Sequence, residues 1–182
     1  MENTKICQRC AMPMEKAEDF STQADGSKNE DYCCYCYENG AFLYPKATME
    51  EVIEGCLPHV VPDVFADEAA AKSAMNKYFP TLKCWKKTGM IISFKLKDGV
   101  STEDFLTASD KIQESYLSKC KGFLTRQLMI MDGVWTDWVI WETLPDAQNS
   151  MGESEENDAA KVFTSLIGEV LEYSLYPLER SY

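Results

Sequence analysis

Basic residues and histidines are scarce in this chain. The 182 residues carry 18 lysines and arginines against 30 aspartates and glutamates, a formal net charge of −12, and only three of the basic residues are arginines. A protein that binds nucleic acid or an anionic membrane through a general basic surface needs the opposite balance, so neither partner is expected. His59 is the one histidine, which excludes metal sites built from several imidazole ligands.

Long apolar runs are also lacking. No stretch approaches the roughly 18 apolar residues that a membrane span requires. The N-terminal residues MENTKICQRC contain no apolar segment typical of a secretory signal, so we expect a cytoplasmic protein. Hydrophobic residues nevertheless make up 45% of the chain, which is enough to bury a core in one large domain or two small ones.

Cysteine, by contrast, is abundant, and five of the eight cysteines lie within the first 36 residues. Cys7 and Cys10 form one CxxC pair, and Cys33 and Cys36 form a second, with 22 residues between the pairs. Each pair can turn both thiolates toward one ion, so the spacing predicts one structural zinc ion per chain, held by four cysteines. The ion would replace the hydrophobic core that a segment of about 45 residues can hardly build.

Other interpretations of these cysteines stay open. Disulfides would require an oxidising compartment, whereas iron also suits a tetrahedral all-thiolate site and could substitute for zinc. Cys34 could replace a neighbour as ligand, but it lies too close to Cys36 for the usual pair, so we expect it to point away from the metal. The turn signal at residues 24–27 predicts a hairpin between the pairs.

Four segments between residues 6 and 87 resemble the zinc ribbon domain family of bacterial and archaeal proteins. They are CQRCAMPM, ADGSKNEDYCCYCYENGAF, TMEEVIEGC and FPTLKCWKK, where the family typically has CxxCGMP, DGSxxxxYCxxCYxxGxF and PxLKRWK. The resemblance implies zinc at the four paired cysteines and no established activity. Ala11 stands where the family usually has glycine, which predicts a strained backbone with positive φ. Cys84 replaces the usual arginine.

Residues 47–87 are predicted to be a helical connector. Thr48 can cap a helix from Met49 to about Leu57, which Pro58 and Pro62 are expected to end. Asp67 can cap a second helix that stops before Pro80. The predicted organisation is a zinc ribbon at 1–46, the connector at 47–87 and a further domain at 88–182.

The C-terminal part alternates between the periods of strands and helices. One predicted helix starts at Ser101 and ends at Lys121 and Gly122, and a second helical stretch follows Pro145 and is broken near Gly152. Strands are expected at 89–97, 123–131, 134–142 and 171–178. The β-α-β-β-α-β order predicts a ferredoxin-like α+β domain.

The second and third of these strands carry apolar residues on both faces. The predicted helices can cover only one face of the sheet, which would leave an apolar face in water. A second copy of the sheet would cover it, so the pattern predicts a homodimer through the C-terminal sheet.

Three further segments resemble the antibiotic-biosynthesis-monooxygenase-like superfamily of dimeric α+β barrels. They are KLKDGVSTEDFL, KGFLTRQL and DGVWTDWVIWETLPDAQ, where the superfamily has PGxxxxF, PGFxxxxL and WxDxxxWxSxxxA. Its members include cofactor-free oxygenases, haem-degrading enzymes and proteins without known activity. Haem degraders of this fold use a strand asparagine and a helix histidine, and residues 88–182 contain no histidine, so no haem is expected.

The function that the sequence favours is that of a non-catalytic or small-ligand-binding homodimer with a structural zinc ribbon. A closed four-cysteine site leaves no open metal position, and no nucleophile–base pair is visible. The predicted pocket lies on the open sheet face, and its methionines and tryptophan would suit a flat aromatic ligand. Its candidate residues are Met129, Met131, Trp138 and Arg126.

Two alternative functions remain. One is a cofactor-independent oxygenase or isomerase that acts on an aromatic substrate in the barrel, but this rests on analogy of fold. Its candidate polar groups are Arg126, Asp137, Tyr173 and Tyr176. The other is a protein-interaction adaptor that docks through the acidic ribbon, in which residues 1–44 contain eight acidic and four basic side chains.

Overall fold

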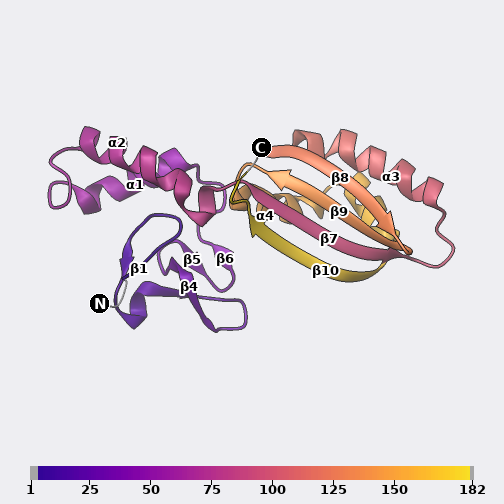
Figure 1. Ribbon diagram of the computed structural model, residues 1–182, viewed down its shortest axis with the longest axis horizontal. Coiled ribbons are helices and arrows are strands. Elements are labelled where there is room, and N and C mark those ends of the chain that lie inside the picture. Colours follow the sequence, from indigo (N-terminus) through magenta and orange to yellow (C-terminus); the bar gives the residue numbers. More distant parts are fainter. Residues whose placement is uncertain (1–3, 181–182) are drawn as a thin grey trace. The chain divides into compact units, whose positions relative to one another are not determined.

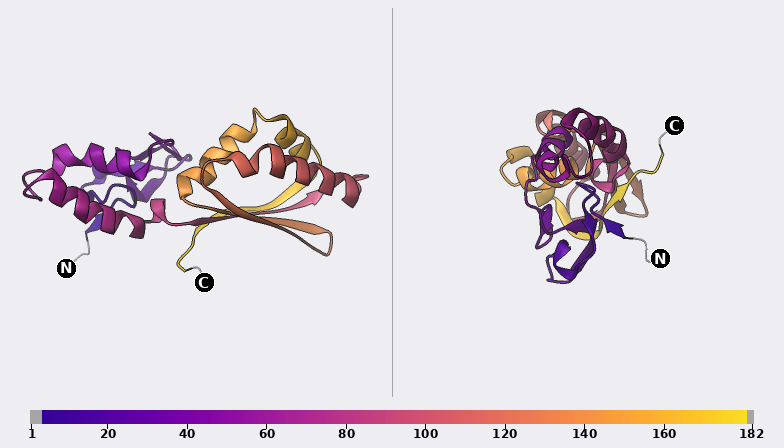
Figure 2. Two further views of the ribbon diagram at one scale, coloured as in Figure 1. Left: turned by 90° about the horizontal axis from the view of Figure 1, so that it is seen from above. Right: turned by 90° about the vertical axis from the view of Figure 1, so that its left-hand side faces the viewer.

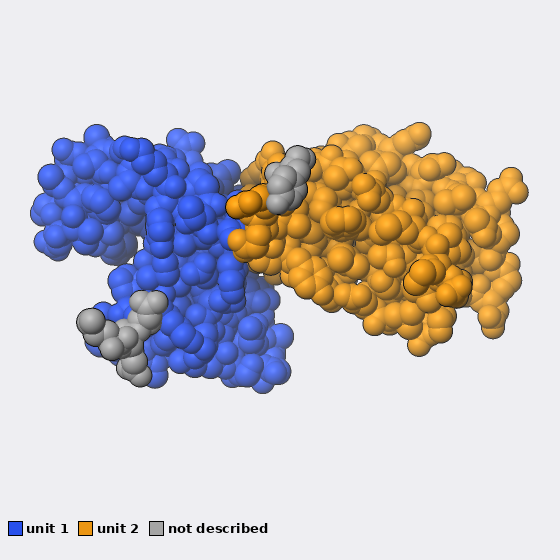
Figure 3. Space-filling view, in the orientation of Figure 1, with its two compact units in different colours: residues 1–86 blue, residues 87–182 orange. Residues whose placement is uncertain are grey.

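The computed structural model describes residues 4–180. It divides the chain into two compact units, residues 1–86 and residues 87–182 (Figures 1 and 3). Among the described residues, no helix combines the length and apolar composition needed to cross a membrane.

The first unit begins with three small antiparallel strand pairs. They are β1 (Lys5–Ile6) with β2 (Pro13–Met14), β3 (Phe20–Thr22) with β4 (Lys28–Cys33), and β5 (Tyr37–Glu38) with β6 (Ala41–Phe42). The predicted hairpin joins β3 to β4. Its turn is closed by Asp25, whose carboxylate accepts from the Ser27 amide at 2.9 Å, and by Gly26, whose φ is +80°.

Two helices complete this unit: α1 (Met49–Val60) and α2 (Glu68–Tyr78). The caps are those that the sequence predicts. Thr48 Oγ1 accepts from the Glu51 amide at 3.2 Å, and the Asp67 carboxylate accepts from the Ala70 amide at 2.8 Å. The expected end at Pro58 is wrong, because α1 continues to Val60. A proline in the last turn removes only its own hydrogen bond, and the Val61 amide still reaches the Leu57 carbonyl at 3.1 Å.

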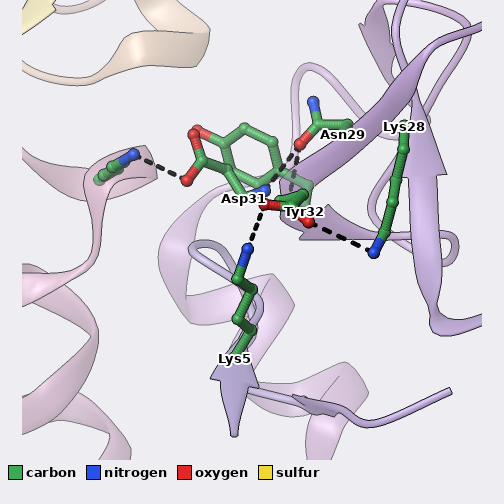
Figure 4. A network of polar contacts seen from close by, with 7 residues as sticks. Lys5, Lys28, Asn29, Asp31 and Tyr32 are labelled. Carbon is green, nitrogen blue, oxygen red and sulfur yellow. Dashed lines mark hydrogen bonds and ion pairs between the residues drawn. The ribbon is translucent and has the colours of Figure 1, made fainter. Parts of the chain in front are cut away.

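Residues of the predicted connector pack and bond with the ribbon inside this unit. Two short 3-10 helices, η2 (Phe79–Thr81) and η3 (Lys83–Trp85), follow α2. The Cys84 amide donates to the Gln8 carbonyl at 3.1 Å. Lys83 Nζ lies 2.7 Å from Asp31 Oδ1 on β4, and Figure 4 shows how Asn29 holds this part of β4 by accepting from the Asp31 amide at 2.8 Å.

The second unit is a four-stranded antiparallel sheet with the strand order β10-β7-β9-β8. Helices cover one of its faces (Figure 2). The strands are β7 (Thr88–Leu96), β8 (Phe123–Met131), β9 (Val134–Trp141) and β10 (Ile167–Pro177); the helices are α3 (Thr102–Ser115), α4 (Leu144–Ser154) and α5 (Asp158–Ser165). The chain order and the sheet order together confirm the predicted ferredoxin-like fold.

Two boundaries in this unit differ from the prediction. α3 ends at Ser115 because Tyr116 leaves helical geometry, with φ −131° and ψ −71°, and the 3-10 helix η4 (Leu117–Lys119) carries the chain on to Gly122. β10 begins earlier than expected, at Ile167, because it pairs with β7 along its whole length through two irregularities in register.

The core of the second unit lies between the sheet and its helices. Phe105 of α3 is central, with its ring centroid 4.6 Å from that of Trp135 and 5.2 Å from that of Phe163. The buried members are Met90, Phe94, Phe105, Ile112, Leu117, Trp135, Val139, Trp141, Ala147, Ala160 and Phe163. No described element of this unit covers the opposite face of the sheet.

Candidate metal centre and open sheet face

Four thiols of the first unit meet at one point. The sulfur atoms of Cys7, Cys10, Cys33 and Cys36 all lie within 4.8 Å of one another, and Cys10 Sγ is 3.7 Å from Cys33 Sγ. A tetrahedral zinc site with Zn–S bonds of about 2.3 Å has S–S edges of about 3.8 Å. The cluster therefore has the size that one tetrahedral ion requires, with at most a small contraction.

The backbone around the first cysteine pair explains this convergence. The Ala11 amide donates to the Cys7 carbonyl at 2.9 Å, and the Cys7 amide donates to the Met12 carbonyl at 2.9 Å, which curls the chain around Cys10. This curl requires a left-handed residue at position 11, and Ala11 has φ +62°. The expected positive φ is thus confirmed, at a position where an L side chain is strained.

The second pair closes against the first. The Cys36 amide donates to the Cys33 carbonyl at 3.0 Å, and the Cys33 amide donates to Cys7 Sγ at 3.3 Å. Gly40 follows with φ +86°, and a Cβ at this position would lie 2.7 Å from the Cβ of Ala24 in the hairpin turn. Glycine is therefore required where the second pair passes the hairpin.

The four clustered thiols interact strongly with one another. Hydrogen bonds from Cys10 and the other thiols hold the pKa of Cys7 well below its ordinary value. Hydrogen bonding with Cys10, together with burial, raises the pKa values of Cys33 and Cys36 well above their ordinary values. Several thiolates this close together would repel one another, so full deprotonation of the cluster requires a bound cation.

The remaining cysteines near the cluster differ in position. Cys34 is not one of the four clustered thiols; its amide donates to the Asp19 carbonyl at 2.9 Å, and burial raises the pKa of its thiol. Cys56 on α1 comes close, with its sulfur 4.0 Å from the Cys10 carbonyl oxygen. Sequence reasoning missed this contact, because nothing in the spacing relates a helix residue to the first pair.

On the second unit, three of the predicted pocket residues share the uncovered sheet face. Trp138 pairs with Ile91 on one side and Gln127 on the other, Met129 pairs with Thr136, and Met131 pairs with Val134. Their exposed fractions are 37%, 45% and 77%. The indole of Trp138 leans over β7, because a Cβ at Gly89 would lie 3.1 Å from its Nε1.

Arg126, the fourth predicted pocket residue, lies on the opposite face. Its Nε and Nη2 donate to the two carboxylate oxygens of Asp137 at 2.8 and 2.6 Å, and Nη1 donates to the Ser109 carbonyl of α3 at 3.2 Å. The side chains of Arg126 and Asp137 are both 7% exposed. Strand alternation places this ion pair beneath the helices, so Arg126 does not join Trp138.

The two tyrosines considered as polar candidates lie on β10 and are both about half exposed. Tyr176 pairs with Gly89, on the uncovered face, and its hydroxyl donates to Glu172 Oε1 at 3.4 Å. Tyr173 pairs with Ile92, and burial raises the pKa of its hydroxyl. Neither tyrosine meets the Arg126–Asp137 pair in a common site.

One family model matches the N-terminal part of the chain. Residues 6–86, which include all four clustered cysteines, match the model of the family described as "Putative zinc ribbon domain". The first unit thus carries a zinc ribbon domain. No curated protein matches the chain.

Solved structures resemble the C-terminal half of the chain. SnoaB, a cofactor-independent oxygenase from Streptomyces nogalater, is 11% identical, with a TM-score of 0.44 over 53% of this chain and 96% of that chain. A dimeric protein of unknown function and ferredoxin-like fold from Bacteroides fragilis is 18% identical, with a TM-score of 0.40 over 50% of this chain and 96% of that chain.

Proposed function

We propose that this chain is a structural zinc protein in which Cys7, Cys10, Cys33 and Cys36 hold one Zn²⁺ ion. The observation that carries the proposal is the meeting of four sulfur atoms within 4.8 Å, from two pairs that lie far apart in the sequence. Tetrahedral all-thiolate geometry suits zinc, and iron can occupy the same ligands. Four protein ligands fill the coordination sphere, so the ion stabilises the fold and has no position for a substrate.

Elemental analysis and native mass spectrometry of the purified full chain test the metal. We expect one zinc per chain in the wild type and none in Cys7→Ser or Cys36→Ser. Cys34→Ser is the matched control, since it removes a neighbouring thiol outside the cluster and leaves the zinc content unchanged. Zinc loss confined to Cys34→Ser, or a wild type that binds no metal even after zinc is supplied, contradicts the proposal.

We further propose that the second unit forms a homodimer through its uncovered sheet face, where a small apolar ligand binds. Met129, Met131 and Trp138 support this proposal, because together they present large apolar side chains on a face that no described element of the unit covers. A second copy would remove these side chains from water. The oxygenase alternative gains no support from Arg126 and Asp137, which neutralise each other beneath the helices.

Sedimentation of the full chain tests the dimer, which should have about twice the mass of one 20.7 kDa chain. Met129→Lys should dissociate it at micromolar concentration, because a charge would be buried between the sheets. Val162→Lys is the control, since Val162 is also exposed but lies on α5. A monomeric wild type, or equal effects of the two lysines, contradicts the interface.

Tryptophan fluorescence tests the ligand site. A planar aromatic compound such as a quinone should quench the fluorescence saturably, and Trp138→Ala should abolish this while keeping the dimer. If Trp138→Ala dissociates the dimer instead, the indole fills the interface and the pocket proposal fails.

A further inference from the structure

Arg9 lies between the two cysteines of the first pair, and its side chain is only 1% exposed. Its Nη2 donates to the Tyr44 carbonyl at 2.5 Å, and its Nη1 lies 3.5 Å from the carbonyl oxygen of Cys36, one of the clustered cysteines. Its Nε is buried and has no hydrogen-bond partner among the described residues. The chain thus places a guanidinium next to the backbone of Cys36.

Two aromatic rings fix the guanidinium in this position. Its carbon lies 4.7 Å from the ring centroid of Phe42 and 5.8 Å from that of Trp85. Phe42 is itself held edge-on against Tyr32 and Tyr37. The Trp85 indole also donates to the Arg9 carbonyl at 2.9 Å, so η3 holds the backbone of Arg9 as well.

The charge of Arg9 has no carboxylate partner among residues 4–180. A buried cation is costly unless a negative charge lies nearby, and carbonyl oxygens and aromatic faces supply only partial charge. The other buried arginine, Arg126, shows the usual solution, since both oxygens of Asp137 accept from it. Among the described residues, Arg9 therefore lacks the full counter-charge that Arg126 has.

We propose that Arg9 is the counter-charge of the metal–thiolate centre, an inference that rests on the proposed zinc site. Four thiolates around a divalent ion carry a formal charge of roughly −2, which a buried site must offset. Arg9 offsets part of this charge across the Cys36 backbone and so strengthens the binding of divalent metal. It is a positioning residue, because it acts through the field at the ligands and does not touch the ion.

Zinc competition against a chromophoric chelator, with the full-length protein, measures this effect. Arg9→Met keeps most of the volume and removes the charge, and it should lower the zinc affinity by about ten- to hundredfold. Arg9→Lys keeps the charge but not the forked, stacked contacts of the guanidinium, so it should lose clearly less affinity than Arg9→Met. Lys16→Met removes one exposed charge from the same unit, and solvent screening should keep its effect below about threefold.

The reduction potential of the iron-loaded full chain separates charge from packing. The ferrous tetrathiolate is one unit more negative than the ferric form, so the cation stabilises the reduced state more. Arg9→Met should lower the potential, by about 59 mV for each tenfold loss of relative stabilisation, and Arg9→Lys should restore it.

Each outcome decides one of the two proposals. If Arg9→Met binds zinc as tightly as the wild type, or if Arg9→Lys loses as much affinity as Arg9→Met, the counter-charge is overturned while the zinc site stands. An unchanged or raised potential in Arg9→Met also overturns it. If Arg9→Met does not fold, Arg9→Lys decides the question. The proposal is supported if Arg9→Lys keeps the zinc affinity and the reduction potential, and it is overturned if Arg9→Lys loses them. A wild type that binds neither metal overturns the zinc site itself.

Discussion

The ribbon part of the first unit and the sheet of the second unit are held together by different means. In the ribbon, the longest strand is the six-residue β4, and the buried residues include all but one of the clustered thiols and a charged arginine. In the second unit, strands of 8 to 11 residues pack against three helices through an aromatic core. We therefore expect the ribbon to depend on the proposed zinc ion for its folding, whereas the second unit is stabilised mainly by apolar burial.

Removing the metal should have the largest effect and separate the two units. Structural zinc contributes about 10–16 kcal/mol of binding free energy, which is folding free energy for a ribbon of this size. A strong chelator should therefore abolish amide-exchange protection in β3 and β4, while β7 and β9 keep theirs. Hydrogen-exchange mass spectrometry of the full chain measures both units together.

Adding zinc back to the chelated protein is the control and should restore the protection in β3 and β4. The comparison breaks down if the chelator leaves the ribbon protected, or if both units lose protection together.

Breaking the ion pair under the helices should have the next largest effect, and it should act on the second unit. Asp137→Ala leaves the Arg126 charge buried without a partner, which costs about 3–5 kcal/mol of unfolding free energy. Chemical denaturation followed by the tryptophans of β9 measures the loss, and the zinc content should not change.

Glu169→Ala provides the matched control for this prediction. It removes one partner of the exposed pair between Lys95 and Glu169, whose side chains are 53% and 61% exposed. Exposed pairs contribute about 0–1 kcal/mol, so this variant should be nearly neutral. Equal losses in the two variants would show that burial of the Arg126–Asp137 pair is unimportant.

Alkaline pH should weaken the ribbon through Tyr32. Burial raises the pKa of this hydroxyl well above its ordinary value. In the unfolded chain the Tyr32 hydroxyl ionises near pH 10. The stability that its burial contributes is therefore complete below about pH 10. It is lost as the pH rises further, by up to about 1.4 kcal/mol per pH unit. Amide exchange of β4 between pH 9 and 11, referenced to intrinsic rates, measures the slope.

Tyr32→Phe should flatten this slope in β4 while leaving the slope in the second unit unchanged. The tyrosines of the second unit continue to titrate in that variant, and Tyr116, whose pKa is also raised by burial, serves as the internal reference. A slope in β4 that persists in Tyr32→Phe would assign the alkaline loss to another group.

The smallest predicted effect is a gain of stability in the ribbon. Ala11 holds a φ of +62°, and an L residue in this region costs about 1–2 kcal/mol. Ala11→Gly should remove most of that strain. Glycine loses more backbone entropy on folding than alanine, so the net gain in stability of the zinc-bound ribbon should be only about 0.5–1 kcal/mol. Thermal unfolding of the zinc-bound protein should show a higher midpoint for the first transition.

The reverse substitution at Gly26 is the companion to this test. Gly26 has φ +80°, and a Cβ added there would have no atom within 4 Å, so Gly26→Ala adds backbone strain without a clash. It should lower the same midpoint. A destabilising Ala11→Gly would mean that the methyl group of Ala11 contributes more through packing than its backbone costs.

Local patterns in the sequence predict the elements of both units. The spacing of the cysteine pairs predicts which thiols meet, because a CxxC turn has little freedom in where its sulfur atoms point. The alternation of apolar residues predicts the ferredoxin-like order, and Thr48, Asp67 and Ser101 are helix caps as expected. The caps and the turn within each cysteine pair could be predicted because their deciding contacts lie within a few residues of one another.

The environments of the two buried arginines could not be predicted in the same way. Arg9 is surrounded by Phe42, Tyr44 and Trp85, which are distant in sequence and carry no signal of this contact. Arg126 lies on a strand that is apolar on both faces, so alternation alone does not tell which face the helices cover. One signal in the sequence does indicate the partner of Arg126. β8 and β9 form a hairpin, and counting its register from the turn at Asp132 and Gly133 brings the oppositely charged Asp137 close to Arg126 on the adjacent strand.

The sheet order also has a consequence for how chains of this protein meet during folding. β8 is an edge strand, so one side of its backbone is unpaired within the sheet, and Ile130 and Met131 next to that edge are 55% and 77% exposed. The other edge strand, β10, is bent by two irregularities in register, a device that discourages strand addition. A face-to-face dimer leaves the β8 edge free, so aggregation by edge-to-edge pairing is expected to start at β8, and a lysine in place of Ile130 would improve folding yield more than stability.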